Sequence, residues 1–446
     1  MAAELRDATG RPGPATWELS RHPEGRGAYP VRGASWFEAV AYCAWKDKSL
    51  PTLYHWKHAA GVEVWNNMLA ASNFDHSGPM PVAATSAVNH YGAVDMAGNV
   101  REWVWTGSRE GRYILGGAWD APTYIYTVYE AADPWSRTPT TGFRCARYFT
   151  PPPADLLQPR EEPYFDFREL EPVDDETFSV YATFYSYDPL NLGAERAVID
   201  STPDWIRERV EFTAAYPEER VPVHIFIPRN STPPYQAVVC MPGLAAFRLT
   251  SSENLSEMAQ LMFIPRSGRA LLYPVYKGTY ERRLTRSFTP SLRRQLAIQM
   301  TQDLMRTVDY IVERPDLDEG RLAFIGLSFG AEFAVPVALE KRFDALVLVG
   351  AALDPAWLGT WPAEAAPWNF VSRITTPTIL INGKADVMHP YEEGQIPFFE
   401  AIDVPPQDKR FEVSDAGHLP PWNEVIRHTL DWLDQRLGTV ELRRDR

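Results

Sequence analysis

Short apolar runs and helical stretches alternate over the second half of the chain. Residues 206–214 and 221–227 alternate between apolar and polar positions on either side of a turn, which predicts an antiparallel pair of strands. Helical stretches, notably 292–312, lie between several further apolar runs of strand length, at 237–241, 270–275, 322–325, 345–349 and 378–381. Strands that are apolar throughout and separated by helices predict a mostly parallel sheet with helices on both faces, and therefore an α/β fold.

The first 150 residues carry fewer such patterns. Ser35 followed by Glu38 matches a capping box, so we predict a helix that begins at Trp36. A second helix is predicted over residues 53–60. The remainder is rich in glycine, asparagine and proline, and nine of the fifteen tryptophans fall in this part. We therefore expect a unit over residues 1–150 with little regular structure, whose core consists of aromatic side chains held by loops.

An acidic, proline-rich stretch separates these two parts. Residues 151–178 contain nine acidic residues, two arginines and six prolines, and they account for half of the net charge of −14. The first 150 residues are neutral overall. Such a composition is typical of a solvated, extended spacer. We predict a linker over residues 151–195 with a short amphipathic helix at 177–187, followed by a second unit over residues 196–440.

The composition also limits the classes of function. Hydrophobic residues make up 45% of the chain and charged residues 23%, which is ordinary for a folded globular protein. No apolar run approaches the roughly 20 residues that cross a bilayer, and no signal-peptide pattern opens the sequence. The excess negative charge disfavours binding to nucleic acid. Three cysteines do not make a disulfide framework, and their spacing does not fit a structural zinc site.

The most informative motif lies at residues 326–330, which read GLSFG and match the pattern G-x-S-x-G. The motif follows the apolar strand 321–325 and precedes a helix predicted at 331–339. This is the setting of a nucleophile elbow, in which small flanking residues allow a sharp turn that exposes the hydroxyl of Ser328. The pattern alone also occurs in glycine-rich turns, so its interpretation depends on whether an acid and a base follow.

A serine nucleophile needs a base, and the base needs a carboxylate that orients it. Asp386 follows the predicted strand 378–381, and His418 follows a predicted strand at 410–413. The order Ser, Asp, His, with each residue just after a strand, matches the hydrolase arrangement. We therefore predict a catalytic triad of Ser328, Asp386 and His418.

Other titratable residues fit these roles less well. Asp415 lies so close to His418 in sequence that a role in a local turn is the better interpretation. His389 follows Asp386 too closely to reach the same nucleophile, and His224 lies inside an early strand.

Acyl transfer also requires two donors for the developing oxyanion. The first is predicted to be the backbone N–H of Phe329, directly after the nucleophile. The second should come from the loop at 242–246, where a glycine allows a close approach of the backbone. We predict the N–H of Leu244, with Ala245 as the alternative.

The region from about residue 205 to 438 resembles the α/β-hydrolase family, close to its dienelactone-hydrolase and prolyl-oligopeptidase-like branches. The elbow, the aspartate and the histidine carry this resemblance. It implies an eight-stranded, mostly parallel sheet and a hydrolase of esters or related acyl bonds.

Four residues are candidates for substrate binding. Tyr276 and Lys277 follow a predicted strand and would point into the cleft, with packing or surface roles as the equal alternative. Residues 353–369 form an insert, and inserts at this place commonly cap the pocket in proteins that look like this family. Trp357 and Trp361 of the insert suit an apolar or aromatic acyl group, and simple packing of the cap is the alternative.

The first unit has a resemblance of its own. Its motifs are VRGASW at 31–36, AYCAW at 41–45, LPT at 50–52, YGAVDMAGNVREW at 91–103, GGAW at 116–119 and GFRC at 142–145. Over about residues 28–148 they resemble formylglycine-generating enzymes, the sulfatase-modifying factors. The resemblance implies a C-type-lectin-like α+β fold whose opening portion is missing, so that Met1 would lie inside a longer ancestral domain.

This unit is expected to be non-catalytic. Oxidising members of the family carry two copper-binding cysteines shortly after the Gly-Gly-x-Trp motif, whereas residues 120–126 here contain none, and Cu(I) needs soft thiolate ligands. His55 and His58 have no third ligand beside them, so we interpret them as structural. Cys43 and Cys145 match scaffold positions of the family, and whether they pair is left open.

The combination of both units resembles the C-terminal part of certain bacterial serine/threonine kinases, although no kinase motif occurs here. We predict a serine hydrolase that cleaves a small-molecule carboxylic ester through an acyl-enzyme intermediate, without a cofactor or metal. An amidase or peptidase of the prolyl-oligopeptidase-like type, and a catalytically silent sensor or binding module, are the alternatives. We expect a cytoplasmic protein, or an extracytoplasmic one if the chain is a piece of a membrane kinase.

Overall fold

The computed structural model describes residues 5–60, 71–74, 77–89, 91–109, 111–121, 125–126, 129–160, 167–284, 289–354, 360–384, 386 and 388–443. The chain divides into two compact units, Met1–Pro163 and Tyr164–Arg446. The division falls inside the stretch 151–195 that the sequence predicts as a linker. Phe167, Tyr185 and Leu192 are buried in the core of the second unit, so the later part of that stretch packs as part of this unit.

The two predicted helices of the first unit are present as α1 (Trp36–Trp45) and α2 (Leu53–Ala60). The capping box at the start of α1 is confirmed. The hydroxyl of Ser35 accepts a hydrogen bond from the backbone N–H of Glu38 at 3.3 Å, and the Glu38 carboxylate accepts one from the backbone N–H of Ser35 at 2.7 Å. These two bonds satisfy donors that a helix start would otherwise leave unpaired.

A small sheet completes the first unit. Its strand order is β3-β2-β1-β4, and the strands are β1 (Arg101–Gly107), β2 (Arg112–Leu115), β3 (Tyr129–Ala132) and β4 (Thr141–Phe143). Tryptophans 36, 56 and 103 are buried in the unit, in agreement with the predicted aromatic core. A disulfide joins Cys43 of α1 to Cys145 after β4, which answers the question that the sequence left open.

The predicted helix at 177–187 is α4 (Asp175–Thr183), which begins two residues earlier and ends four residues sooner. Its start is set by Asp174, whose carboxylate accepts a hydrogen bond from the backbone N–H of Thr177 at 2.8 Å. An aspartate at this position is a strong helix N-cap, and it lies just outside the apolar pattern from which the helix was predicted.

The second unit contains one sheet of nine strands in the order β13-β12-β11-β10-β8-β9-β7-β6-β5. Neighbours from β13 to β9 run parallel, whereas β7 is antiparallel to both β9 and β6, and β5 is antiparallel to β6. The strands are β5 (Glu195–Ser201), β6 (Trp205–Thr213), β7 (Arg220–Pro228), β8 (Tyr235–Met241), β9 (Ala270–Pro274), β10 (Leu317–Leu327), β11 (Ala345–Val349), β12 (Thr378–Gly383) and β13 (Lys409–Ser414). The order and directions of strands β6 to β13 are those of an α/β-hydrolase sheet.

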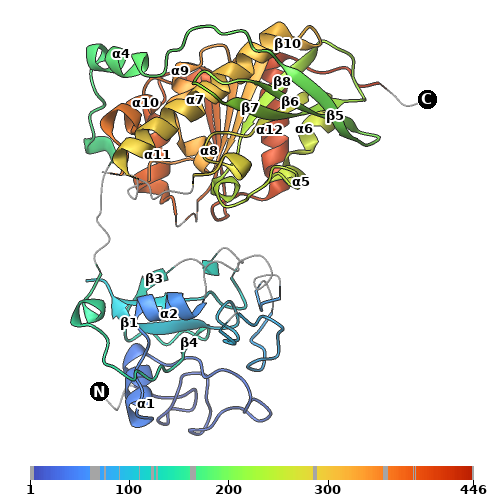
Figure 1. The fold of residues 1–446 in the computed structure, drawn as a ribbon. Coiled ribbons are helices and arrows are strands. Elements are labelled where there is room, and N and C mark those ends of the chain that lie inside the picture. The colour runs from blue at the N-terminus through green and yellow to red at the C-terminus, as the bar shows by residue number, and fades with distance from the viewer. Residues whose placement is uncertain are drawn as a thin grey trace. The chain divides into compact units, whose positions relative to one another are not determined.

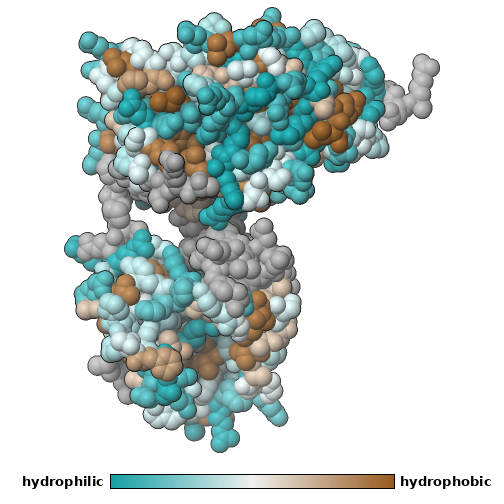
Figure 2. Space-filling view, viewed as in Figure 1, coloured by the Kyte–Doolittle hydropathy of each residue, from teal (hydrophilic) through white to brown (hydrophobic). Residues whose placement is uncertain are grey.

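The expected count of eight strands is wrong, because β5 adds a ninth at the edge. All seven residues of β5 are exposed, so the strand shows no apolar alternation that the sequence would reveal. Its pairing with β6 is irregular between Val198 and Asp200, which is the mark of a β-bulge. Val198 and Ile199 are exposed, and Figure 2 shows hydrophobic surface at the edge of the second unit where Figure 1 draws β5.

Helices cover both faces of the large sheet (Figure 1). Alternate residues of β8 enter two different cores: Val239 packs in the core that contains α7 (Pro290–Glu313), and Val238 in the core that contains α12 (Trp422–Leu437). This explains why β8 is apolar throughout. The shorter helical segments of the second unit are η3 (Phe167–Glu169), η4 (Leu244–Phe247), α5 (Met258–Leu261), α6 (Phe263–Arg266), η5 (Tyr280–Arg282), η7 (Ala363–Ala365), α10 (Trp368–Val371), η8 (Tyr391–Gln395), α11 (Ile396–Ala401) and η9 (Pro406–Asp408).

The helix predicted at 331–339 is two helices, α8 (Phe329–Glu332) and α9 (Val335–Leu339). Pro336 explains the interruption. A proline has no N–H to donate to the carbonyl four residues earlier, which here belongs to Glu332, and its ring collides with that carbonyl. None of the described helices combines the length and hydrophobicity that crossing a membrane requires.

Candidate active site

Ser328 lies in the sharp turn between β10 and α8, with φ of 51° and ψ of −118°. A residue other than glycine rarely has a positive φ, and such strained turns concentrate at functional sites. Both glycines of the motif are required by packing. A methyl group on Gly326 would overlap the carbonyl oxygen of Gly330, and one on Gly330 would overlap the carbonyl oxygen of Met241, at the end of β8. The turn is thus pressed against the neighbouring strand.

The structure brings Ser328, His418 and Asp386 together in one hydrogen-bonded chain. Nε2 of His418 lies 2.7 Å from Oγ of Ser328, and Nδ1 of His418 lies 2.7 Å from Oδ2 of Asp386. Because a carboxylate only accepts, His418 donates from Nδ1 and leaves Nε2 to accept the proton of the Ser328 hydroxyl. His418 follows β13 and Asp386 follows β12, so adjacent parallel strands deliver both residues to the same edge of the sheet.

The carboxylate of Asp386 is fully buried and held on both oxygens. Its Oδ1 accepts the backbone N–H groups of Met388 at 2.9 Å and His389 at 3.2 Å, and its Oδ2 faces His418. Burial opposes the ionisation of Asp386, but the nearby His389 and His418 side chains outweigh burial and hold its pKa well below the usual range. Asp386 therefore remains a carboxylate that fixes the orientation of His418.

Two residues that the sequence analysis did not assign to the site complete this cluster. The side chain of His389 is buried, with Nε2 at 2.7 Å from Oε1 of Glu332 and Nδ1 at 3.4 Å from Oδ2 of Asp386. Burial disfavours the charged imidazole, but Glu332 and Asp386 outweigh it and raise the pKa of His389 well above its usual value. Two short spacings in the sequence could have pointed to them: His389 lies three residues after Asp386, and Glu332 lies four residues after Ser328.

The predicted oxyanion loop lies beside the nucleophile. A Cβ atom on Gly243 would be 3.4 Å from Cβ of Ser328, so the backbone of this loop is in contact with the elbow. The backbone N–H of Gly243 donates a hydrogen bond to the buried carboxylate of Glu257. Leu244 follows as the exposed first residue of η4, and Phe329 is the first residue of α8.

Tyr276 and Lys277 do not join the cluster, which corrects the expectation that they point into the cleft. The phenol of Tyr276 is fully buried and donates to the carbonyl of Cys240 at 3.0 Å. The ammonium of Lys277 pairs with Glu219, and its backbone N–H donates to Asp303 at 2.7 Å. The sequence showed that both residues follow β9, but not toward which face their side chains turn.

Trp361 lies in a row of aromatic rings that starts at the elbow. Phe329 stacks on Phe333 at 5.4 Å between ring centroids, and Phe333 lies 5.3 Å from Trp361. Phe247 meets the other side of Phe329 at 4.9 Å. Phe333 thus lies between Trp361 and Phe329, the residue that follows the nucleophile. Trp357 lies outside the described residues.

The alternative histidines have other partners. Nε2 of His224 lies 3.0 Å from the Ser252 hydroxyl, and burial together with the neighbouring arginines lowers its pKa to about 3. In the first unit, His55 contacts the hydroxyl of Thr52 at 2.6 Å, and His58 contacts that of Tyr91 at 3.2 Å.

Among the residues that the structure describes, two groups of side chains have the spacing of a metal site. They are Asp386, His389 and His418, and Glu332, Asp354 and His389, with potential ligand atoms within 4.8 Å of one another. The ring nitrogens of both histidines already face carboxylates or the Ser328 hydroxyl at the distances given above. Hydrogen bonding and ion pairing therefore account for the arrangement, and a metal would have to displace these contacts.

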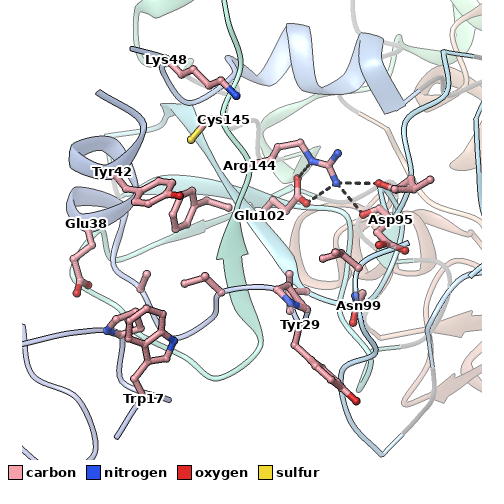
Figure 3. Close-up of a pocket in the computed structure, with 18 residues that line it drawn as sticks. Trp17, Tyr29, Glu38, Tyr42, Lys48, Asp95, Asn99, Glu102, Arg144 and Cys145 are labelled. Carbon is pink, nitrogen blue, oxygen red and sulfur yellow. Dashed lines mark hydrogen bonds and ion pairs between the residues drawn. The ribbon is translucent and has the colours of Figure 1, made fainter. Parts of the chain in front are cut away.

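A cavity of about 640 Å³ lies in the first unit and is lined by Trp17, Tyr29, Tyr42 and Lys48 among others. Figure 3 shows Arg144 at its wall, paired with Glu102 at 2.5 Å and bonded to the backbone carbonyl of Asp95 at 3.1 Å. Arg144, just after β4, thus joins Glu102 of β1 to the loop that contains Asp95. No residue of the Ser328 cluster lines this cavity, so the candidate chemistry lies in the second unit.

Residues 13–149 match the family model of the sulfatase-modifying factor enzyme 1-like domain. The resemblance of the first unit is confirmed. Inactive C-alpha-formylglycine-generating enzyme 2 of Bos taurus is 31% identical over 182 residues, which cover 30% of this chain and 58% of that protein. The serine/threonine-protein kinase pkn1 of Chlamydia caviae is 30% identical over 156 residues, which cover 28% of this chain and 25% of the kinase. The chain thus spans only part of the length of these relatives.

Solved structures are similar to the chain at the level of fold. The acetyl xylan esterase from Paenibacillus sp. R4 aligns with a TM-score of 0.47 and 16% identity, covering 59% of this chain and 94% of the esterase. An acylaminoacyl peptidase aligns with a TM-score of 0.42 and 12% identity, covering 53% and 43% respectively. The assignment of an α/β-hydrolase fold rests on the strand order and the position of the elbow in this chain.

Proposed function

We propose that the second unit is a serine hydrolase that cleaves carboxylic esters of small molecules through an acyl-enzyme intermediate. The observation that carries this proposal is the chain of two 2.7 Å hydrogen bonds from Ser328 through His418 to Asp386, at a strained turn between β10 and α8. A serine hydroxyl is a weak nucleophile until a base removes its proton, and this arrangement supplies the base in the required orientation.

In the proposed mechanism, Oγ of Ser328 attacks the ester carbonyl carbon while Nε2 of His418 takes the hydroxyl proton. The carbonyl oxygen becomes an oxyanion, for which the N–H groups of Phe329 and Leu244 are the proposed donors. As the ester bond breaks, His418 gives its proton to the leaving alcohol oxygen. A water molecule then loses a proton to His418 and attacks the acyl carbon. The bond from Oγ of Ser328 to the acyl group breaks, His418 returns the proton to Oγ, and the acid is released.

A serine-reactive fluorophosphonate probe tests the nucleophile. The wild-type protein should be labelled at Ser328, and Ser328→Ala should abolish labelling without a change in melting temperature. Ser267→Ala is the matched control, because its hydroxyl donates to the carbonyl of Ile264 at 2.7 Å, in the segment after α6. Labelling that persists in Ser328→Ala would overturn the assignment, and a wild type that is never labelled would support a catalytically silent module.

A substrate panel separates the ester from the amide hypothesis. We expect p-nitrophenyl esters to be hydrolysed with a higher kcat/KM than aminoacyl-p-nitroanilides. Esters of increasing acyl length in the same panel report the acyl preference of the site. A preference for anilides would replace the esterase by an amidase or peptidase.

We further propose that the first unit, over residues 1–150, does not catalyse formylglycine formation, because residues 120–126 contain no thiol ligand for copper. Neither EDTA nor a copper chelator should change ester hydrolysis. A chelator-sensitive activity that returns on addition of metal would contradict the proposal of a metal-free site.

A further inference from the structure

The chain of contacts from Ser328 does not end at Asp386. His389 contacts the same Oδ2 atom of Asp386 that binds His418, and on its other side it bonds to Glu332. Glu332 is the last residue of α8, the helix that starts directly after Ser328. The five side chains therefore form a chain of contacts that begins and ends on the elbow, where the backbone N–H of Glu332 donates to the carbonyl of Ser328 at 2.9 Å.

We propose that His389 and Glu332 are positioning residues: Glu332 holds a charged His389 against Asp386, and the charge on His389 opposes a second positive charge on His418. This inference rests on the proposed function, since it assigns the ion pair to the same serine hydrolase. The charge on His389 would thereby extend the working range of the base toward low pH, and Glu332 would act by keeping that charge in place.

The geometry gives the direction of the effect. The rings of His389 and His418 lie 4.8 Å apart between centroids and meet at 71°, so a positive charge on His389 opposes a second one on His418 in the resting site. The carboxylates of Glu332 and Asp386 favour the proton on His389, whose side chain is only 1% exposed.

The charged and titratable groups that face His389 come from four elements. Glu332 belongs to α8, Asp386 to the loop after β12 and His418 to the loop after β13. Asp354, after β11, has a carboxylate oxygen within 4.8 Å of the ligand atoms of Glu332 and His389. When His418 accepts the proton of Ser328, the carboxylates of Asp386, Glu332 and Asp354 lie around the two imidazoliums and offset the repulsion between them.

The deciding measurement is the pH dependence of kcat/KM for ester hydrolysis. In His389→Gln the amide still reaches Glu332 but carries no charge, so the acid limb of the profile should move to higher pH by about one unit, the size typical of a charge within 4–6 Å. The double variant His389→Gln/Glu332→Gln removes the positive charge of His389 together with the negative charge of Glu332. Its acid limb should therefore move less than that of His389→Gln. His428→Gln is the matched control. His428 lies on α12 and also faces a glutamate, Glu412 of β13, at 3.4 Å.

An acid limb that stays within about 0.2 pH units of wild type in His389→Gln, even with a lower kcat, would overturn the proposal, because a merely structural role lowers activity without moving the limb. Nitrogen-15 NMR of the imidazoles in Ser328→Ala provides a second readout that needs no activity and no folded His389 variant. His389 should keep both ring protons well above the ordinary titration range of histidine, and loss of one near the ordinary value of about 6.5 would also overturn the proposal. If the wild type neither hydrolyses esters nor reacts with the fluorophosphonate, the proposed function is wrong, and the ion pair has no role in catalysis. The NMR result still reports whether the ion pair exists.

Discussion

The α-carbon of Gly330 faces the carbonyl oxygen of Met241 at a distance that leaves no room for a side chain. Gly330→Ala must therefore displace either the elbow or the end of β8. We expect a loss of stability of about 1–3 kcal/mol, the usual cost of overpacking, and loss of fluorophosphonate labelling because Ser328 moves with the turn. Urea unfolding and labelling measure both. Gly320→Ala is the control, since a Cβ there would have ordinary contact, 3.6 Å from Asp318; equal effects in both variants would contradict the prediction.

Asp386→Asn should lower kcat by about 10³–10⁴-fold, because an amide no longer fixes the tautomer and orientation of the histidine. The hydrogen bond from Nδ1 of His418 to Oδ2 of Asp386 is the contact that the substitution removes. Asp415, which is exposed and three residues before His418, offers the matched control. Asp415→Asn should retain nearly full kcat, and a large loss there would return Asp415 to the list of candidate acids.

The raised pKa of His389 also makes a prediction for stability. A group whose pKa is raised in the folded state stabilises the protein fully below its unfolded pKa, about 6.5 for histidine, and the contribution is lost as the pH rises through the folded value. The difference in free energy of unfolding between wild type and His389→Gln should thus be largest near pH 6 and shrink toward pH 9. Urea titrations at three pH values measure this, and a constant difference would be inconsistent with a charged His389.

The ionic network around Asp303 should affect stability rather than substrate binding. Asp303 is fully buried and pairs with Arg282 at 2.7 Å, and it accepts the phenol of Tyr216 at 2.7 Å. Asp303→Asn removes one of the two carboxylates that pair with the buried guanidinium of Arg282, the other being Glu219 at 3.2 Å, so the unfolding free energy should fall by about 1.5–3 kcal/mol. Asp408→Asn, which disrupts a partly exposed pair with Arg436, should cost no more than about 1 kcal/mol.

In the same network, Lys277→Gln should leave KM for esters unchanged. The ammonium of Lys277 pairs with the carboxylate of Glu219, and the same carboxylate also pairs with Arg282. A rise in KM without a change in stability would restore Lys277 as a substrate-binding residue. Initial-rate kinetics over the ester panel, with melting temperatures recorded in parallel, distinguish the two outcomes.

The disulfide between Cys43 and Cys145 can be counted chemically. Alkylation of the denatured, unreduced protein should modify one cysteine, Cys240, and alkylation after reduction should modify all three. The bridge closes a loop of about 100 residues, so Cys43→Ser should destabilise the first unit by roughly 2–4 kcal/mol. Modification of three cysteines without reduction would show that the bridge does not form in the protein as prepared.

The Ser328, Asp386 and His418 cluster could be predicted because each residue directly follows an apolar strand, and parallel strands deliver such residues to one edge of the sheet. The same reasoning failed for Tyr276 and Lys277. They also follow a strand, but sequence position does not tell where a side chain turns. Tyr276 is buried against the carbonyl of Cys240, and the side chain of Lys277 pairs with Glu219.

Other features were hidden for different physical reasons. The pairing of His389 with Glu332 joins residues 57 positions apart, and it exists only because α8 and the loop after β12 meet in the fold. The division of the helix after the elbow was in principle readable from Pro336, but the apolar pattern continues through the break. The edge strand β5 carries no pattern at all, because neither of its faces is buried.

That edge has a consequence for how the protein behaves at high concentration. An open strand at the end of a sheet offers unpaired backbone groups to any extended chain, and exposed Val198 and Ile199 would favour such contact. Glu195, Arg196 and Asp200 place charges along the same strand, and the irregularity between Val198 and Asp200 breaks its regular hydrogen-bond spacing. A second molecule therefore finds no straight, uncharged edge on which to continue the sheet, and polymerisation through β5 is held back by the strand itself.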